Sequence, residues 1–244
     1  MKEPLQIFQG IDRSDVPAAD FHMHTTWTDG QASVAAMHSR AIECGLEWVL
    51  FSEHARRTSG EWFDEFAQEV RALPTDSCRA LVGVECKVDD FDGTLDAREG
   101  ILSTCDLVMA SVHRFPGEVT FLKGDAAGYS KKEAIDLEFR LAMAALANPL
   151  VDILGHPLGM CCRRFGHEAP EDAMRALIAE AANTGVAFEI NCHYHADPWQ
   201  LIDWCHSAGA PIALGSNAHS VSEVGRIQRI LKGVEEAWNP SGSS

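Results

Sequence analysis

Short apolar segments rich in β-branched residues alternate along the chain with longer segments of helical period, from about Asp20 to the C-terminus. The short segments predict strands at residues 20–25, 48–54, 80–88, 107–113, 151–156, 187–192 and 212–216. The longer segments predict helices at residues 33–44, 61–73, 131–147, 171–184, 199–208 and 222–237. Strands and helices that alternate in this way are typical of β-α units built around a parallel sheet.

Several predicted helix boundaries carry residues that favour a helix end. Ser33 can cap the start of the first helix, and Pro170 and Pro198 suit the first turns of two later helices. Gly185 and Gly209 follow predicted helix ends, where glycine readily adopts the left-handed conformation. These local signals support the helix assignment independently of the hydrophobic pattern.

Polar residues stand where the predicted apolar strands end. In chain order they are His22, His24, Glu53, His54, Glu85, His113, His156, Asn191, His193, Asn217 and His219. In a β/α barrel the carboxyl ends of all strands share one rim. We therefore expect an α/β barrel in which residues scattered along the sequence converge at one mouth.

Length and composition favour one domain of barrel size. The chain has 244 residues, of which 46% are hydrophobic. We expect a single barrel domain at residues 1–238, followed by a flexible C-terminal tail at residues 239–244. No run approaches the roughly 18 apolar residues of a membrane span, and the first residues do not resemble a signal peptide. A cytoplasmic location is the expectation that follows.

The cysteines and the net charge narrow the function classes further. The eight cysteines are scattered without a CxxC pair, so free thiols are the expected state. The formal charge of −16 opposes broad binding to an anionic membrane or to nucleic acid. We therefore expect no membrane partner and consider nucleic acid an unfavourable one, and any anionic substrate must be attracted locally.

The first strand end carries the clearest metal-binding pattern. His22 and His24 are two residues apart in a predicted strand, so their side chains leave the same face and can bind one ion. The following Asp29-Gly30 pair is typical of a turn and brings a carboxylate near the same rim. Imidazole and carboxylate donors suit zinc, manganese or iron.

Six ordered motifs show that the chain resembles the PHP (polymerase and histidinol phosphatase) family over nearly its whole length. The motifs are DFHMHTTWTDG at residues 20–30, SEH at 52–54, GVE at 83–85, ASVH at 110–113, DILGHP at 152–157 and GSNAHS at 215–220. The resemblance implies a distorted seven-stranded (β/α)7 TIM-like barrel with a centre of two or three divalent metal ions.

The resemblance also implies a ligand for each ion. The first ion would be bound by His22, His24, Glu85 and Asn217, the second by Glu85, His113 and His156, and the third by Asp29, His54 and His219. Asn217 departs from the family, which usually has aspartate there. An amide oxygen can still bind a metal ion, but it brings no charge and cannot take a proton from water.

Arginines follow several of these predicted ligands. Arg56, Arg57, Arg114 and Arg163 are candidate substrate contacts, because guanidinium groups suit phosphate oxygens and carboxylates. Glu85, Asn217 and His193 are the candidate catalytic residues, and His193 could line the pocket or orient a ligand. His38, His167 and His206 are interpreted as structural.

The sequence therefore predicts a metal-dependent hydrolase of phosphate ester bonds, with a phosphomonoesterase acting on a small phosphorylated metabolite as the leading hypothesis. A phosphodiesterase or 3′-end nuclease is the first alternative, because the motifs look closest to PHP domains attached to family X polymerases. A degenerate metal or ligand sensor is a second, suggested by Asn217. Hydrolysis of an amide or carboxylic ester stays open, since metal hydroxide can also attack a carbonyl.

Overall fold

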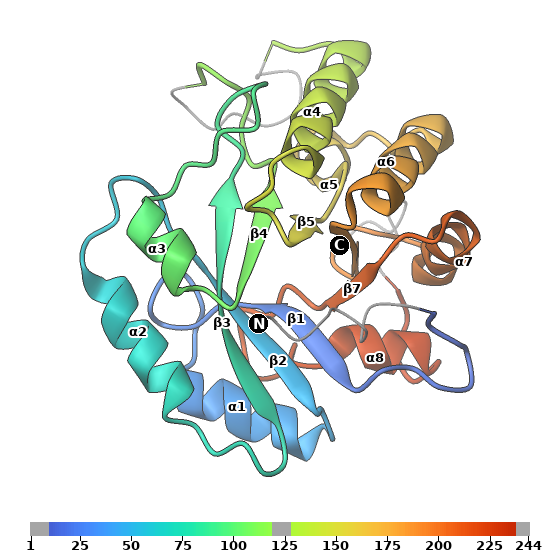
Figure 1. The fold of residues 1–244 in the computed structure, drawn as a ribbon. Helices are drawn as coiled ribbons and strands as arrows, with labels where there is room; N and C mark the ends of the chain where they lie inside the picture. Colours follow the sequence, from blue (N-terminus) through green and yellow to red (C-terminus); the bar gives the residue numbers. More distant parts are fainter. Residues whose placement is uncertain (1–9, 119–127, 238–244) are drawn as a thin grey trace.

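The computed structural model describes residues 10–118 and 128–237, and these form one barrel-shaped α/β unit (Figure 1). Seven parallel strands follow one another around the sheet in sequence order. They are β1 (Ala19–Met23), β2 (Trp48–His54), β3 (Arg79–Lys87), β4 (Leu107–Ser111), β5 (Ile153–Gly155), β6 (Ala187–Asn191) and β7 (Ile212–Gly215). The predicted (β/α)7 architecture is confirmed.

Helices surround the strands as an outer layer (Figure 1). They are α1 (Val34–Glu43), α2 (Trp62–Arg71), α3 (Glu99–Thr104), α4 (Lys131–Leu146), α5 (Gly159–Phe165), α6 (Glu171–Thr184), α7 (Pro198–Ala208) and α8 (Arg226–Leu231). In the described part of the chain, no helix is both long and apolar enough to cross a bilayer.

The barrel closes near the carboxyl ends of its first and last strands. An isolated parallel bridge joins Met23 to Ala218 beyond the end of β7. The backbone N–H of His24 donates to the Ala218 carbonyl at 2.8 Å, and the Ala218 N–H donates to the His22 carbonyl at 3.1 Å. This closure brings His22 and His24 beside the segment that carries Asn217 and His219.

Two separate apolar cores support the strands. A small inner cluster fills the barrel with Phe21, Leu50, Met109 and their neighbours, all of them buried. A larger cluster packs the outer faces of the strands against the helices. Strands buried on both faces are typical of parallel sheets, and this explains their continuous apolar runs. The strand ends leave this apolar environment, so most of the predicted metal ligands lie there.

Local chemistry explains the helix ends that the sequence predicts. The Ser33 side chain accepts a hydrogen bond from the Ala36 N–H at the start of α1. Pro198 is in the first turn of α7, and Gly209 ends that helix in the left-handed conformation. These cap predictions are confirmed.

One helix prediction was too long, and two short helices were not predicted. The predicted helix at residues 222–237 is shorter, because Gly225 has φ +71° immediately before α8 and Gly233 has φ +70° just after it. The short helices α3 and α5 were not predicted, because six or seven residues give too little periodicity to recognise. The tail predicted at residues 239–244 lies outside the described residues.

Candidate metal centre

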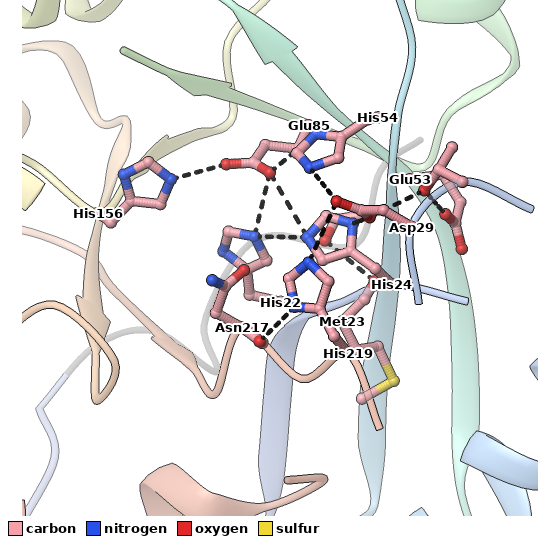
Figure 2. Close-up of polar contacts among 12 residues, drawn as sticks. His22, Met23, His24, Asp29, Glu53, His54, Glu85, His156, Asn217 and His219 are labelled. Atoms are coloured by element: carbon pink, nitrogen blue, oxygen red, sulfur yellow. Dashed lines mark hydrogen bonds and ion pairs between the residues drawn. The ribbon is translucent and has the colours of Figure 1, made fainter. Parts of the chain in front are cut away.

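Glu85, near the end of β3, lies at the centre of a ring of imidazoles (Figure 2). Its Oε1 is 3.1 Å from Nε2 of His113 and 2.8 Å from Nε2 of His156. Its Oε2 is 3.3 Å from Nε2 of His22 and 3.2 Å from Nδ1 of His54. One buried carboxylate therefore faces histidines delivered by four other strand ends.

The donor atoms fall into three compact groups. The groups are His22, His24 and Glu85; Glu85, His113 and His156; and His24, Asp29, His54 and His219. Within each group the nitrogen and oxygen atoms that could bind a metal ion lie within 4.8 Å of one another. The structure thus brings together eight of the nine predicted ligands, and the ninth, Asn217, lines the same pocket.

The side chains of His22 and His24 lie on one face at the end of β1. The pairing register with β2 shifts between Asp20 and Met23. Figure 2 shows the rings of His22 and His24 directed toward Glu85, whereas the Met23 side chain points away from it. The two rings meet at 3.1 Å between their Nε2 atoms. The predicted shared face of His22 and His24 is therefore present at the mouth.

The turn that carries Asp29 is fixed by a buried carboxylate of β2. Glu53 accepts hydrogen bonds from the Thr25 N–H at 2.8 Å, from the Thr25 hydroxyl at 2.6 Å and from the Thr28 hydroxyl. Gly30 is also required here, since a Cβ at this position would lie 2.3 Å from the His24 carbonyl oxygen. This packing holds Asp29 near His54 and His219, at 3.5 Å from each ring.

Glu189 in β6 is the functional residue that the sequence reasoning missed. Its Oε1 lies 2.7 Å from Nδ1 of His22 and accepts from the Asn191 amide at 2.8 Å. Its Oε2 accepts the backbone N–H of His156. A glutamate between Phe188 and Ile190 in a buried strand was the available signal, because a carboxylate is rarely fully buried without a partner.

Hydrogen bonds to one ring nitrogen orient the other toward the centre. In His22, Nδ1 donates to Glu189, which leaves Nε2 to face Glu85. In His219, Nδ1 donates to the Asn217 carbonyl at 2.9 Å, which leaves Nε2 to face Asp29. Partners of this kind fix the tautomer and the ring orientation of metal-binding histidines.

Burial and charge favour the cation-binding forms of Glu85, His24 and His113. Burial alone would lower the pKa of His22, His54 and His219, but nearby carboxylates raise it. Burial lowers the pKa of His24 well below its ordinary value, helped by His54 and His22, and burial also lowers the pKa of His113. Burial alone would raise the pKa of Glu85, but the surrounding His113 and His22 lower it well below its usual value. Glu85 is therefore ionised, and His24 and His113 are neutral, near pH 7.

Backbone strain is concentrated at the same site. Within the described residues, the non-glycine residues with positive φ are His156 at 28°, Leu158 at 56° and Asn217 at 50°. Such conformations cost about 1–3 kcal/mol each and persist where surrounding contacts impose them. Two of the three are predicted metal ligands, so the strain lies in the segments that present donor atoms.

Buried side chains hold the strained segment after β5. His195 donates from Nε2 to the Pro157 carbonyl at 3.1 Å, and its Nδ1 accepts the Asn191 N–H at 3.1 Å. Glu138 of α4 accepts the N–H groups of Met160 and Cys161 at 3.0 and 2.7 Å. These contacts fix the path of the chain between His156 and α5.

The predicted substrate contacts are placed unequally. Arg56 and Arg114 line a pocket of about 570 Å³ that also contains the ligands Asp29, His54, Glu85, His113, His156, Asn217 and His219. Arg163 lines a smaller adjoining pocket of about 190 Å³ together with His113 and His156. Arg57 lies among the lining residues of neither pocket and pairs with Asp89 and Asp96.

His193 has a supporting position. Its ring Nε2 accepts a hydrogen bond from Arg163, and its backbone N–H donates to the Asn191 side chain at 2.9 Å. Burial, with the nearby Arg163, lowers the pKa of His193 to about 4. His193 is therefore neutral near pH 7 and is directed at Arg163, although it was predicted to be a catalytic residue.

Two buried ring nitrogens test whether cations fit this site. Within the described residues, Nδ1 of His24 and Nδ1 of His156 are buried and have no hydrogen-bond partner. Leaving such an atom unsatisfied costs about 1–3 kcal/mol, so unsatisfied imidazole nitrogens on residues of a donor cluster are expected where a cation binds. The donor set of nitrogen and carboxylate oxygen suits zinc, manganese or iron.

Comparison with known proteins identifies the family to which the chain is similar. The model of the PHP domain matches residues 20–193. The chain is 28% identical to the DNA polymerase/3′-5′ exonuclease PolX of Bacillus subtilis over 90% of its own length, but it covers only 37% of that polymerase. It is 29% identical to a protein of Thermoanaerobacter sp. named a probable phosphatase, with 89% of this chain and 85% of the relative covered.

Solved structures show the same fold. A crystal structure of histidinol phosphate phosphatase from Lactococcus lactis, complexed with zinc, L-histidinol and phosphate, matches with a TM-score of 0.67 at 21% identity. The match covers 91% of this chain and 97% of the other. The family model spans more than half of the chain and includes seven of the eight grouped donors. The chain therefore belongs to the PHP domain family.

Proposed function

We propose that the chain is a phosphomonoesterase that hydrolyses a small phosphorylated metabolite with a metal-activated water. Family membership and the donor set around Glu85 make it a metal-dependent hydrolase of phosphate esters. The observation that carries the finer proposal is that Glu85 belongs to two donor groups and also lines a pocket of about 570 Å³. Pockets of roughly 300–1,000 Å³ suit small molecules.

We assign the donors to two or three divalent ions of zinc, manganese or iron. A first ion takes His22, His24, Glu85 and Asn217, a second takes Glu85, His113 and His156, and a third takes Asp29, His54 and His219. Such ions, when bound, polarise phosphoryl oxygens and lower the pKa of a bound water toward neutrality. The protein fixes the positions of these ligands. Glu189 accepts a hydrogen bond from His22, and Glu53 accepts one from the turn that carries Asp29.

The remaining polar groups of the site orient the substrate. Arg163 lies beside His113 and His156, where its guanidinium can contact non-bridging phosphoryl oxygens. His193 accepts a hydrogen bond from Arg163 and so holds that side chain in place. We therefore assign His193 to positioning Arg163, because its lowered pKa leaves Nε2, the nitrogen that accepts from Arg163, without a proton.

Residue 217 is an asparagine where the family usually has an aspartate, and this difference affects proton removal from the attacking water. Its amide oxygen can bind a cation, but an amide cannot accept a proton as a carboxylate does. The substitution Asn217→Asp needs no change of backbone, since aspartate tolerates the φ of 50° about as well as asparagine does. We expect kcat to increase by about 100-fold or more, because a positioned general base contributes about 10²–10⁴-fold.

The outcome of this substitution separates an enzyme from a sensor. Appreciable phosphate release by the unchanged protein would dismiss a purely metal-sensing or ligand-sensing role. If only the Asn217→Asp protein releases phosphate, the natural chain has lost the activity and the sensor hypothesis takes its place.

Phosphate release from a panel of phosphorylated metabolites tests the main proposal directly. The panel includes histidinol phosphate and nucleoside monophosphates, with protein loaded separately with zinc and with manganese. We expect release above the rate of a Glu85→Gln control prepared in the same way. Uniform inactivity of protein whose metal content has been verified would contradict the proposal.

A 3′-end nuclease is the second candidate, and the similarity to the polymerase and exonuclease PolX favours it. The net charge of −16 opposes it, because nucleic-acid affinity at physiological salt depends on neutralising phosphates. Degradation of an end-labelled oligonucleotide that persists in moderate salt would favour the nuclease. Activity confined to small esters would support the phosphomonoesterase.

A further inference from the structure

The pocket at the metal centre extends beyond the metal-binding residues. We call this extension the side arm, and it is lined by Ala55, Arg56, Thr58, Lys87, Asp96 and Arg114. Lys87 is the last residue of β3, and the others come from the segments that follow β2, β3 and β4. Any part of a substrate that reaches away from the metal ions on this side lies against them.

The side arm carries an excess of positive charge. Of its four charged residues, Arg56, Lys87 and Arg114 are cationic and Asp96 is anionic. Lys87 is paired with Asp89 at 2.6 Å. Asp96 accepts the backbone N–H of Arg57 at 3.2 Å and faces its guanidinium at 3.4 Å. The carboxylate of the arm is thus already neutralised by a cation from outside the pocket.

Arg56 and Arg114 are the other two cationic residues of the side arm. Among the described residues, neither guanidinium lies within 4 Å of a carboxylate or makes a side-chain hydrogen bond. Both line the pocket, Arg56 as an exposed residue and Arg114 as a half-buried one. Guanidinium groups in a pocket wall suit carboxylate or phosphate oxygens, to which they can donate two parallel hydrogen bonds.

The positive charge of the side arm contrasts with the negative net charge of the whole chain. The chain has 36 acidic residues and 20 lysines and arginines, so its general field repels anions. Two arginines that line one pocket without a close ion pair are therefore not part of a basic surface. The ester phosphate itself is served by the metal ions and Arg163, which leaves Arg56 and Arg114 for a different group.

We propose that the preferred substrate is a phosphate ester whose alcohol portion carries a second anionic group, a carboxylate or a second phosphate. This inference rests on the proposed function, because it assumes that the ester phosphate is bound at the metal ions. The second anion lies in the side arm against Arg56 and Arg114. An alcohol portion that carries an amine is disfavoured there, since its positive charge meets two guanidinium groups.

A set of two-carbon esters that differ only in charge tests this inference. The set is O-phosphoethanolamine with a cationic alcohol portion, 2-hydroxyethyl phosphate with a neutral one and 2-phosphoglycolate with an anionic one. We expect kcat/KM to increase in that order, with at least about a tenfold difference between the ends, which corresponds to one charge-assisted contact. The difference should shrink at high ionic strength.

The variants Arg56→Gln and Arg114→Gln locate the effect. Each should lower kcat/KM for 2-phosphoglycolate by about tenfold or more, while kcat/KM for 2-hydroxyethyl phosphate changes less than about threefold. The matched control is Arg40→Gln on α1, which removes an exposed arginine paired with Glu43 far from the pocket. That control should leave all three esters unchanged. Thermal unfolding of each variant checks that it is folded.

Different results would contradict the proposed function and this inference. Absence of phosphate release from all three esters and from the wider metabolite panel, with verified metal content, would overturn the proposed function and this inference with it. Good activity with a flat charge profile, or a preference for O-phosphoethanolamine, would overturn the inference alone. So would arginine variants that slow all three esters equally, because Arg56 and Arg114 would then bind the transferred phosphate.

Discussion

The metal centre has a buried half and an open half, and they are held in different ways. The buried half consists of His22, His24, Glu85 and His156, whose side chains are 0%, 0%, 1% and 3% exposed. The open half consists of Asp29, His54, His113 and His219, whose side chains are 54%, 30%, 31% and 29% exposed. Both halves supply the same kinds of donor, so the difference lies in their support.

In the buried half a carboxylate contacts the donor residues directly, whereas in the open half a carboxylate acts on Asp29 only through a turn. Glu189 joins His22 of β1 to the backbone of His156 after β5. Asp29 lies in a loop that Glu53 fixes through the threonine side chains of that same loop. Segments with few buried contacts open most easily. We therefore expect the open half to exchange its ion more readily and to be the side where substrate enters.

The largest effect should come from removing the carboxylate that serves both halves. Glu85→Gln keeps the size of the side chain but removes the negative charge that lies between the histidines. Because metal activation contributes several kcal/mol, we expect kcat to fall by about 10³-fold or more. Elemental analysis of the dialysed protein should show at least one ion lost. Full metal content together with near-normal kcat would show that Glu85 does not hold the centre together.

The second largest effect should come from substituting the carboxylate that supports each half, Glu189 for the buried half and Glu53 for the open half. Glu189→Gln should weaken metal binding by about 10–100-fold, the usual cost of losing an oriented partner of a metal ligand. Glu53→Gln is the matched change on the open side. We expect Glu189→Gln to reduce retention of the ions bound by the buried half, and Glu53→Gln to reduce retention of the third ion alone. Metal content during graded dialysis against a chelator measures both.

Identical patterns of ion loss in the two variants would remove the distinction between the halves. A fall in the free energy of unfolding without a change in metal retention would assign Glu189 and Glu53 to folding alone. The two readouts are therefore recorded on the same preparations.

This contrast also explains how far the sequence could lead. Strand order and the convergence of His22, Glu85 and His156 follow from an alternating β-α pattern, because parallel strands end at one rim. A strand end is a local feature, and a histidine or glutamate there is visible in the sequence. The donors of both halves were therefore predictable.

The supporting residues were not predictable in the same way. Glu189 lies inside a strand and acts on residues of two other strands, so its role depends on a register that spacing does not give. Arg57 stands next to Arg56 in the sequence, yet it pairs with Asp89 and Asp96 because the loop turns its side chain out of the pocket. Helix α5, which carries Arg163, is too short to produce a periodic signal.

The free energy of unfolding should depend on pH through His195, which supports the segment after His156. Burial lowers the pKa of His195 to about 4 from the ordinary value of 6.5, so between these values the unfolded chain binds a proton that the folded chain does not. Stability linked to His195 is therefore complete above pH 6.5 and declines as the pH falls toward 4. From pH 7.5 to 5 we expect His195 alone to remove about 2 kcal/mol from the free energy of unfolding.

The variant His195→Phe isolates that contribution. It lacks the titrating group and the hydrogen bond to the Pro157 carbonyl, so it should be less stable than the natural protein at pH 7.5. The gap between the two proteins should narrow by about 2 kcal/mol at pH 5. Urea unfolding at the two pH values, with equal metal content, measures it. A gap of constant size would show that His195 titrates normally in the folded protein.

The smallest effect should come from Arg57, at the outer edge of the open half. It was a predicted substrate contact, but it lies outside the pocket and neutralises Asp96 within the side arm. Arg57→Ala leaves that carboxylate without its partner, and the arm becomes less positive. We expect KM for an anionic ester to rise by about two- to threefold with kcat unchanged, in keeping with the small energy of an exposed ion pair. A loss of kcat would mean instead that Arg57 reaches the reacting phosphate, and that the open half closes around the substrate further than its present geometry requires.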